Sequence, residues 1–262
     1  LTFLKSALEE VFTKKFLSDQ NDIESIDKDI ILINDILMSN PLSLRFWSSF
    51  FVILPIFFQA PWVRFYPTSA LLFTFFILIV AFALSKKLWN KWFILGSLLF
   101  GVGGSWLGGC LFWGWLSSHP VLHIPVEAVA LPLALVGLGS QFKIGSSFYI
   151  SSLFGTAITD LTILCTGIMD QWMEVINADP EQAPKILQRT SENLIHIKPL
   201  IIILSAAIIL WIISKIISNF ASFNSHNGMA LMVAKYVLQT TLIVDGIFIF
   251  LALVQPKLSG LV

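Results

Sequence analysis

The chain of 262 residues is too apolar, and too poor in charge, to be a soluble domain. Hydrophobic residues make up 56% of it and charged residues 12%, whereas a soluble domain carries roughly a quarter charged residues. Basic and acidic residues number 16 each, so no net charge attracts nucleic acid. We therefore predict an all-α, polytopic transmembrane helical bundle in a lipid bilayer, without a nucleic-acid partner.

The first part of the chain differs in composition from the rest. Up to Asn40 it is rich in charge and its apolar residues recur at helical spacing. No long apolar core follows the early lysines, so this part does not resemble a secretory signal. We predict a helical tail on the cytoplasmic or stromal side over residues 1–43, and the transmembrane bundle over residues 44–262.

Apolar windows of about 20 residues, each a predicted span, follow this tail. They are Leu44–Val63, Pro67–Leu84, Trp92–Leu116, Pro125–Ser140, Ser146–Met169, Pro199–Ile217 and Met229–Val254. The first window is the weakest because its continuous apolar run is short for a crossing, so six spans is the alternative to seven. Between the fifth and sixth windows, residues 170–198 are predicted to form amphipathic helices on the outer surface.

The basic residues fall unevenly on the two sides of a seven-span bundle. The side of the tail holds eleven: Lys5, Lys14, Lys15, Lys28, Arg45, Lys86, Lys87, Lys91, Lys143, Lys215 and Lys235. The other side holds five: Arg64, Lys185, Arg189, Lys198 and Lys257. Because positive residues are enriched in cytoplasmic loops, we predict a cytoplasmic N-terminus and an external C-terminus.

The third window carries small residues at every fourth position: Ser97, Gly101, Ser105 and Gly109. Such a row lets two helix backbones approach closely in lipid. Tight packing inside the bundle is the first interpretation of the row, and a homodimer or a flat ligand is the second.

Three carboxylates fall inside or at the edge of predicted spans: Glu127, Asp160 and Asp245. An ionisable group there costs about 2.5–3.5 kcal/mol on insertion scales and is a functional candidate by default. Each also has a structural explanation. Glu127 suits the first turn of a helix, and hydroxyls one turn earlier, Thr156 and Thr241, could hold the other two.

The predicted topology collects these carboxylates in the outer half of the bundle. Asp160 and Asp245 each lie about nine residues from an outer helix end, or roughly 14 Å. Gln59 and Arg64 reach the same level from the first outer loop. The sequence therefore predicts one polar pocket that also includes Glu127, with Arg64 as the counter-charge.

Two histidines and two tryptophans, His119, His123, Trp113 and Trp115, lie near the same outer end. They are candidate ligands for a cofactor, and an interfacial belt is the alternative. His119, His123 and Glu127 have the spacing of metal ligands on one helix, but intervening prolines argue against a continuous helix. No metal site is predicted.

Three strings of sequence are distinctive: PIFFQAPWVR at 55–64, FWGWLSSHPVLHIPVEAVALP at 112–132, and FY followed by GTAITDL within 148–161. Together they resemble an uncharacterised integral-membrane family of cyanobacteria, known only as domain of unknown function family 3120. The resemblance covers roughly Leu44–Leu253. It implies a cyanobacterial host, and hence a thylakoid or plasma membrane, but no activity and no site residues.

Motifs of hydrolases and nucleotide-driven pumps are absent, since there is no phosphate-binding Gly-rich loop, no His-Glu-x-x-His and no Gly-x-Ser-x-Gly. Three function classes remain. The first, in the photosynthetic membrane that the resemblance implies, is a non-enzymatic protein that binds a cofactor such as chlorophyll or a carotenoid, or assists assembly of a larger complex. The second is a proton- or ion-coupled transporter of a small solute, with Asp160 and Asp245 titrating. The third is an intramembrane enzyme acting on a lipid or isoprenoid, with Glu127 and Asp160 as acid and base.

Overall fold

A computed structural model describes residues 41–86, 92–179, 181–223 and 227–259 of the chain. The chain divides into two compact units, Leu1–Leu44 and Arg45–Val262. The second unit holds almost all of the described residues. The tail predicted over residues 1–43 lies outside the described residues as far as Asn40.

All regular structure within the described ranges is helical. The α-helices are α2 (Pro41–Leu54), α3 (Ala60–Phe65), α4 (Pro67–Leu84), α5 (Phe93–Leu111), α6 (His123–Glu127), α7 (Leu131–Gly137), α8 (Lys143–Thr166), α9 (Met169–Asn177), α10 (Ala183–Asn193), α11 (Ile197–Phe223) and α12 (Gly228–Val254). Short π or 3₁₀ segments are η1 (Pro55–Gln59), η3 (Phe112–Leu116), η4 (Pro120–Leu122), η5 (Ala128–Ala130) and η6 (Pro256–Leu258).

These elements form 7 helical segments that are long and apolar enough to cross a membrane. The weakest predicted window belongs to one of them, Leu42–Phe65, because the π turn η1 joins α2 to α3 without a break. The predicted helical bundle is therefore confirmed, and seven spans rather than six fit the described residues.

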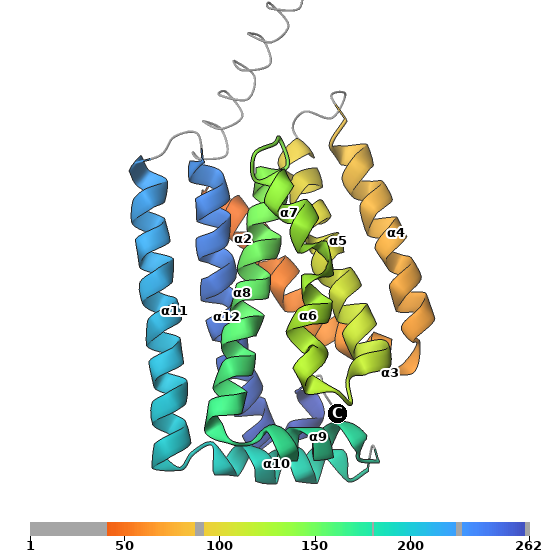
Figure 1. Cartoon of the computed structure of the whole chain (residues 1–262), viewed down its shortest axis with the longest axis vertical. Coiled ribbons are helices and arrows are strands. Elements are labelled where there is room, and N and C mark those ends of the chain that lie inside the picture. The colour runs from red at the N-terminus through yellow and green to blue at the C-terminus, as the bar shows by residue number, and fades with distance from the viewer. Residues whose placement is uncertain (1–40, 87–91, 180, 224–226, 260–262) are drawn as a thin grey trace, which may run out of the picture. The chain divides into compact units, whose positions relative to one another are not determined.

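The crossing helices lie side by side, and α9 and α10 lie across one end of them (Figure 1). The inner faces of α9 and α10 carry Val175 and Leu187, which pack with Ala252 of α12 in one buried cluster. Polar side chains such as Glu174 and Glu192 remain exposed on these two helices. The amphipathic pattern of residues 170–198 thus forms a helical cap over one end of the bundle.

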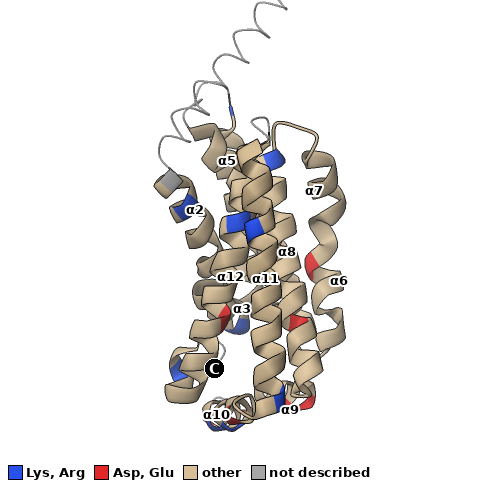
Figure 2. Ribbon diagram, turned by 90° about the vertical axis from the view of Figure 1, so that its left-hand side faces the viewer, with Lys and Arg blue, Asp and Glu red and all other residues tan. Residues whose placement is uncertain are grey.

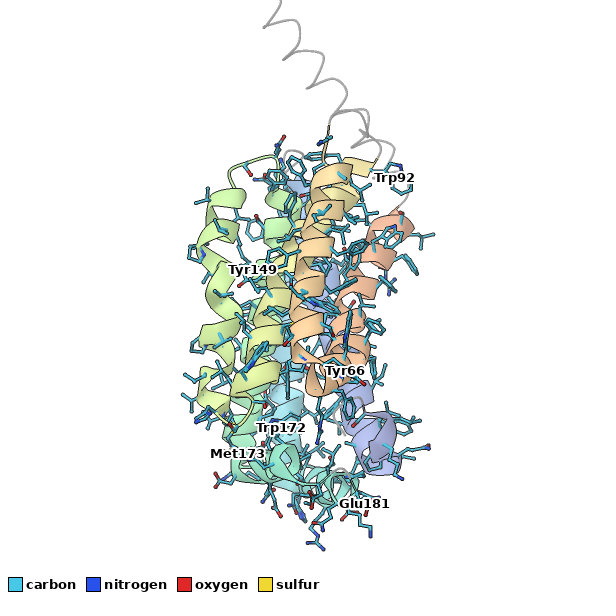
Figure 3. All side chains as sticks on the ribbon, turned by 90° about the vertical axis from the view of Figure 1, so that its right-hand side faces the viewer. Tyr66, Trp92, Tyr149, Trp172, Met173 and Glu181 are labelled. Atoms are coloured by element: carbon cyan, nitrogen blue, oxygen red, sulfur yellow. The ribbon has the colours of Figure 1, made fainter. Side chains whose placement is uncertain are left out.

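Charge is distributed unequally along the bundle (Figure 2). Among the described residues, no Asp or Glu precedes Glu127 in the chain, and the end at which α2 begins carries Lys and Arg only. The end covered by α9 and α10 carries both signs. Trp92 lies toward the first end, whereas Tyr66 and Trp172 lie toward the second (Figure 3). Aromatic side chains of this kind are typical of the two membrane interfaces.

The fourth span is broken into short pieces, η4, α6, η5 and α7, by its prolines. Pro132 has no N–H to donate to the carbonyl one turn earlier, so a continuous α-helix cannot form there. The hydroxyl of the buried Tyr149 repairs the break: it donates to the Glu127 carbonyl (2.5 Å) and accepts from the Ala130 N–H (3.2 Å). A membrane-buried backbone must find such partners inside the protein.

This span begins at Pro120, earlier than the predicted start at Pro125. Proline is well suited to the first turn of a helix, where its missing N–H would have no partner. His123 is consequently the first residue of α6 and not part of a loop. Glu127 is the last residue of α6, so the predicted helix-start role of its carboxylate does not apply.

The small residues of α5 allow neighbouring helices of the bundle to approach it closely. A Cβ on Gly101 would collide with the Gly145 carbonyl of α8, and a Cβ on Gly145 would collide with the Ser97 carbonyl. The Gly145 N–H donates to the Ser97 hydroxyl (3.2 Å). A Cβ on Gly108 would come within 2.7 Å of the Glu127 Cα. These contacts agree with the first interpretation of the row of small residues in α5, which is close helix packing inside the bundle.

Candidate functional site

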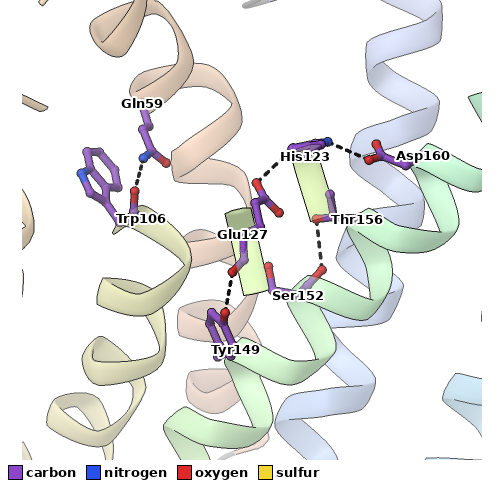
Figure 4. Close-up of polar contacts among 8 residues, drawn as sticks. All are labelled: Gln59, Trp106, His123, Glu127, Tyr149, Ser152, Thr156 and Asp160. Atoms are coloured by element: carbon purple, nitrogen blue, oxygen red, sulfur yellow. Dashed lines mark hydrogen bonds and ion pairs between the residues drawn. The ribbon is translucent and has the colours of Figure 1, made fainter. Parts of the chain in front are cut away.

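His123 lies between two carboxylates that come from different helices. Its Nδ1 is 2.8 Å from Asp160 Oδ2 on α8, and its Nε2 is 3.2 Å from Glu127 Oε1, one turn along α6 (Figure 4). The side chains of His123, Glu127 and Asp160 are 13%, 18% and 24% exposed. An imidazole donates to both neighbours only when both nitrogens carry protons; otherwise one carboxyl group must hold a proton. The three groups therefore share at least one proton.

The aromatic π turn η3, which follows α5, packs against the imidazole. The His123 ring stacks on Phe112, with the ring centroids 4.1 Å apart and the planes inclined by 26°. Trp113 meets the same ring edge-on, at a centroid distance of 5.8 Å. Trp113, a predicted cofactor ligand, thus packs against His123.

A third carboxylate, Asp245 of α12, lies close to this cluster through Thr159. The Thr159 hydroxyl donates to Asp245 Oδ2 (2.8 Å), and Thr159 is adjacent in the chain to Asp160. The hydroxyls expected to hold these two carboxylates do something else. Thr156 donates to the Ser152 carbonyl and Thr241 to the Val237 carbonyl, as threonine hydroxyls in helices commonly do.

These groups line one cavity of about 240 Å³ that is bounded by parts of α2, α5, α6, α8 and α12. Its polar lining includes Glu127, Asp160, Asp245, His123 and Gln59. Four of the five residues predicted for the polar pocket are thus brought together. Among the described residues that line it there is no Lys or Arg, and His123 is the one basic side chain of this lining.

Gln59 occupies the wall of this cavity but already has partners. It is buried, and its amide nitrogen donates to the Trp106 carbonyl (2.6 Å) and to Cys110 Sγ (3.1 Å). Both amide protons are therefore used to attach the π turn η1 to α5. Gln59 also lies against Gly109, where a Cβ would come within 3.1 Å of the amide.

The other residues predicted for the site lie elsewhere. Arg64, the predicted counter-charge, is exposed in the last turn of α3 and is not among the residues that line the cavity. His119 is exposed and its Nδ1 is 3.1 Å from the Ser118 hydroxyl. Trp115 is 51% exposed, as an interfacial tryptophan would be.

Within the described residues, no group of three or more His, Cys, Asp or Glu side chains could hold a metal ion. Each ring nitrogen of His123 already bonds to a carboxylate. A histidine that binds a metal ion must instead offer a free nitrogen lone pair to the metal, so the His123 cluster is not arranged as a metal site.

Sequence patterns did not indicate Tyr149, Thr159 or the pairing of His123 with Asp160. The pairing joins residues 37 positions apart, and it depends on how α6 and α8 are rotated about their axes. The available signals were the four-residue spacing of His123 and Glu127 and the shared depth of His123, Glu127 and Asp160 at one end of the bundle.

Comparison with known families places much of the chain in one described family. Residues 48–253 match the model of the family described as "Protein of unknown function (DUF3120)". Searches of curated proteins and of solved structures gave no match. The match covers the candidate cluster and every transmembrane segment in whole or in large part. The chain is therefore a member of this family of proteins of unknown function.

Proposed function

We propose that the protein exchanges protons for a small cationic solute across the membrane. The observation that carries the proposal is the position of His123, bonded to Asp160 and to Glu127 inside a cavity that Asp245 also lines. Ionisable side chains at such depth are costly, and in transporters they form proton relays and substrate sites. This develops the second function class inferred from the sequence.

The charge of the cavity favours a cation. Three carboxylates face one histidine, so the fully ionised cluster keeps an excess of negative charge even when the imidazole is protonated. A proton or a bound cation would each reduce this excess, and the cost of an unpaired charge in a low-dielectric site makes the two compete. Competition for one site is the basis of exchange.

Access to the cavity is restricted on one side. The nearly fully buried Phe51, Val52 and Val244 line it toward the end at which α2 begins. Beyond them, a hydrogen bond of 2.7 Å joins Ser49 of α2 to Thr240 of α12. At the cluster itself the carboxylates are partly accessible. A site that is closed toward this side supports a carrier in one of its two states.

The exchange is tested in proteoliposomes that contain a trapped pH-sensitive dye. Choline and tetramethylammonium are suitable probes because they cannot cross lipid as neutral bases. We expect an inward gradient of either cation to raise the internal pH in the presence of the protein. Asp160→Asn and Asp245→Asn should abolish this change, and Glu192→Gln, an exposed carboxylate of α10, should keep it. A response no larger than in protein-free vesicles, or one that survives Asp160→Asn, contradicts the proposal.

A cofactor-binding or assembly role in a photosynthetic membrane, whether thylakoid or plasma membrane of a cyanobacterium, has less support from the geometry. Both nitrogens of His123 are engaged, and a pigment's magnesium would need one of them. His119 remains as a surface ligand candidate. Purification in mild detergent tests this alternative, because a coloured preparation or constant protein partners would favour it over exchange.

A further inference from the structure

A second cavity, of about 190 Å³, lies between α8, α11 and α12, with α10 across its end. Its walls are largely hydrocarbon, with residues such as Ile158, Ala207 and Leu242. The threonines of α8 add little polarity because their hydroxyls bond within the protein. Thr162 donates to the Ile158 carbonyl (2.7 Å), and Thr166 donates to the Ile163 carbonyl (2.8 Å).

The hydrocarbon walls of this cavity offer few partners to ordered water, and beside the threonines of α8 its polar side chains are chiefly Asp245, Thr190 and Ser191. A buried water needs two to four polar partners, and an engineered apolar cavity of about 150 Å³ in another protein stays dry and takes up benzene. Side chains that line an empty cavity lack dispersion contacts on the side of the void. Binding of a hydrocarbon that fills the cavity restores these contacts and is therefore favourable. The cavity therefore suits an apolar chain.

The two cavities share part of their walls. Five residues line both: Thr159, Ile163, Trp172, Asp245 and Phe248. Asp245 and Thr159, whose hydroxyl donates to Asp245, thus lie at the boundary between the hydrocarbon-lined cavity and the polar cavity. A molecule with a polar end and an apolar chain would match this change in lining.

We propose that the two cavities bind one amphiphile. Its hydrocarbon chain would occupy the space between α8, α11 and α12, and its cationic end would lie at Asp245 and the His123 cluster. The positive end follows from the three carboxylates and the lack of Lys or Arg in the described lining of the polar cavity. The inference rests on the proposed exchange and names its substrate class: a cation with a single alkyl or prenyl chain.

The test uses Trp172, which lines both cavities, as a reporter. Dodecyltrimethylammonium with a bromine at the end of its chain is added to the protein in nanodiscs. Quenching of Trp172 is obtained as the difference from Trp172→Phe. We expect saturable quenching, and we expect tetramethylammonium, which has the same head without a chain, to compete only weakly.

Filling the cavity should weaken binding of the chain. Gly246 lines it, and a Cβ there would meet no atom within 4 Å, so Gly246→Leu projects into open space without a backbone clash. We expect its dissociation constant for the brominated probe to rise about tenfold, equivalent to roughly two displaced methylene groups. Ala207→Leu fills the same cavity from α11 and should act alike. Ala83→Leu, on the exposed face of α4, is the matched control and should change nothing.

Non-saturable quenching, or equal affinity in the parent protein, Gly246→Leu and Ala207→Leu, overturns the chain site. Failure of the exchange function is a separate result. In that case Asp160→Asn leaves proton movement unchanged, while the two cavity-filling variants still weaken the brominated probe.

Discussion

At the scale of single residues, the cavity contains two kinds of polar side chain. His123 and its carboxylates bond to one another and could exchange protons or ligands without breaking a backbone contact. Gln59 bonds to the Trp106 carbonyl of α5 and holds η1 against that helix. The two kinds should therefore respond differently to substitution.

Gln59→Leu should lower the free energy of unfolding by about 1 kcal/mol, the typical net value of a hydrogen bond, and should leave choline-driven proton movement intact. Unfolding in mixed micelles and the proteoliposome measurement check the two halves. If proton movement stops while stability is unchanged, Gln59 belongs to the exchanging cluster instead.

Sequence reasoning located the right depth for the cluster but not all of its members. Glu127, Asp160, Asp245 and Gln59 were identified because polar side chains in apolar windows stand out, and all four line one cavity. Arg64 is the one cation of the first predicted outer loop, and it does not line this cavity. Packing decides which side of a short helix faces inward. The contacts of His123 with Asp160 and Glu127 therefore could not be predicted from the sequence.

At the scale of elements, α5 is the central helix, and its small residues decide how closely α8 and α6 approach. The Gly101–Gly145 contact brings the backbones of α5 and α8 together. At Gly108, the absence of a side chain leaves room for the Glu127 backbone of α6. Since α8 carries Asp160 and α6 carries His123, these contacts also determine whether the cluster can form.

Gly145→Ala tests the close approach. The added methyl group would overlap the Ser97 carbonyl, and we expect a loss of about 1–3 kcal/mol of stability despite the better helix propensity of alanine. Gly246→Ala is the control, since it meets nothing within 4 Å and should gain up to about 1 kcal/mol. Equal effects of the two substitutions in unfolding experiments would show that α5 and α8 are not in backbone contact.

The elements themselves could be predicted to different degrees. Hydropathy located all seven spans, because length and apolar composition are properties of the local sequence. The pieces of the fourth span could not be predicted, since Pro132 indicates a break but not that Tyr149, from α8, would bond across it.

At the scale of the whole molecule, the uneven distribution of charge predicts its orientation. The end with Lys and Arg only is expected in the cytoplasm, and the cap of α9 and α10 outside. Cysteines introduced in a Cys110→Ala, Cys165→Ala background test this. In intact cells, an impermeant maleimide should label Asp179→Cys, between α9 and α10, and should reach Gln141→Cys, between α7 and α8, only after permeabilisation. Labelling with the opposite pattern reverses the orientation.

The convergence of α6 and α8 on a shared proton site is tested most directly by a double-mutant cycle. The free energies of unfolding of His123→Phe, Asp160→Leu and the double variant are compared with that of the parent protein. Because His123→Phe removes the bonding partner of Asp160, and Asp160→Leu leaves His123 bonded to Glu127 alone, we expect a coupling of about 1–3 kcal/mol. His119→Phe combined with Asp160→Leu is the control and should be additive. Additivity within about 0.5 kcal/mol for His123 and Asp160 as well would contradict the site on which the proposed exchange depends.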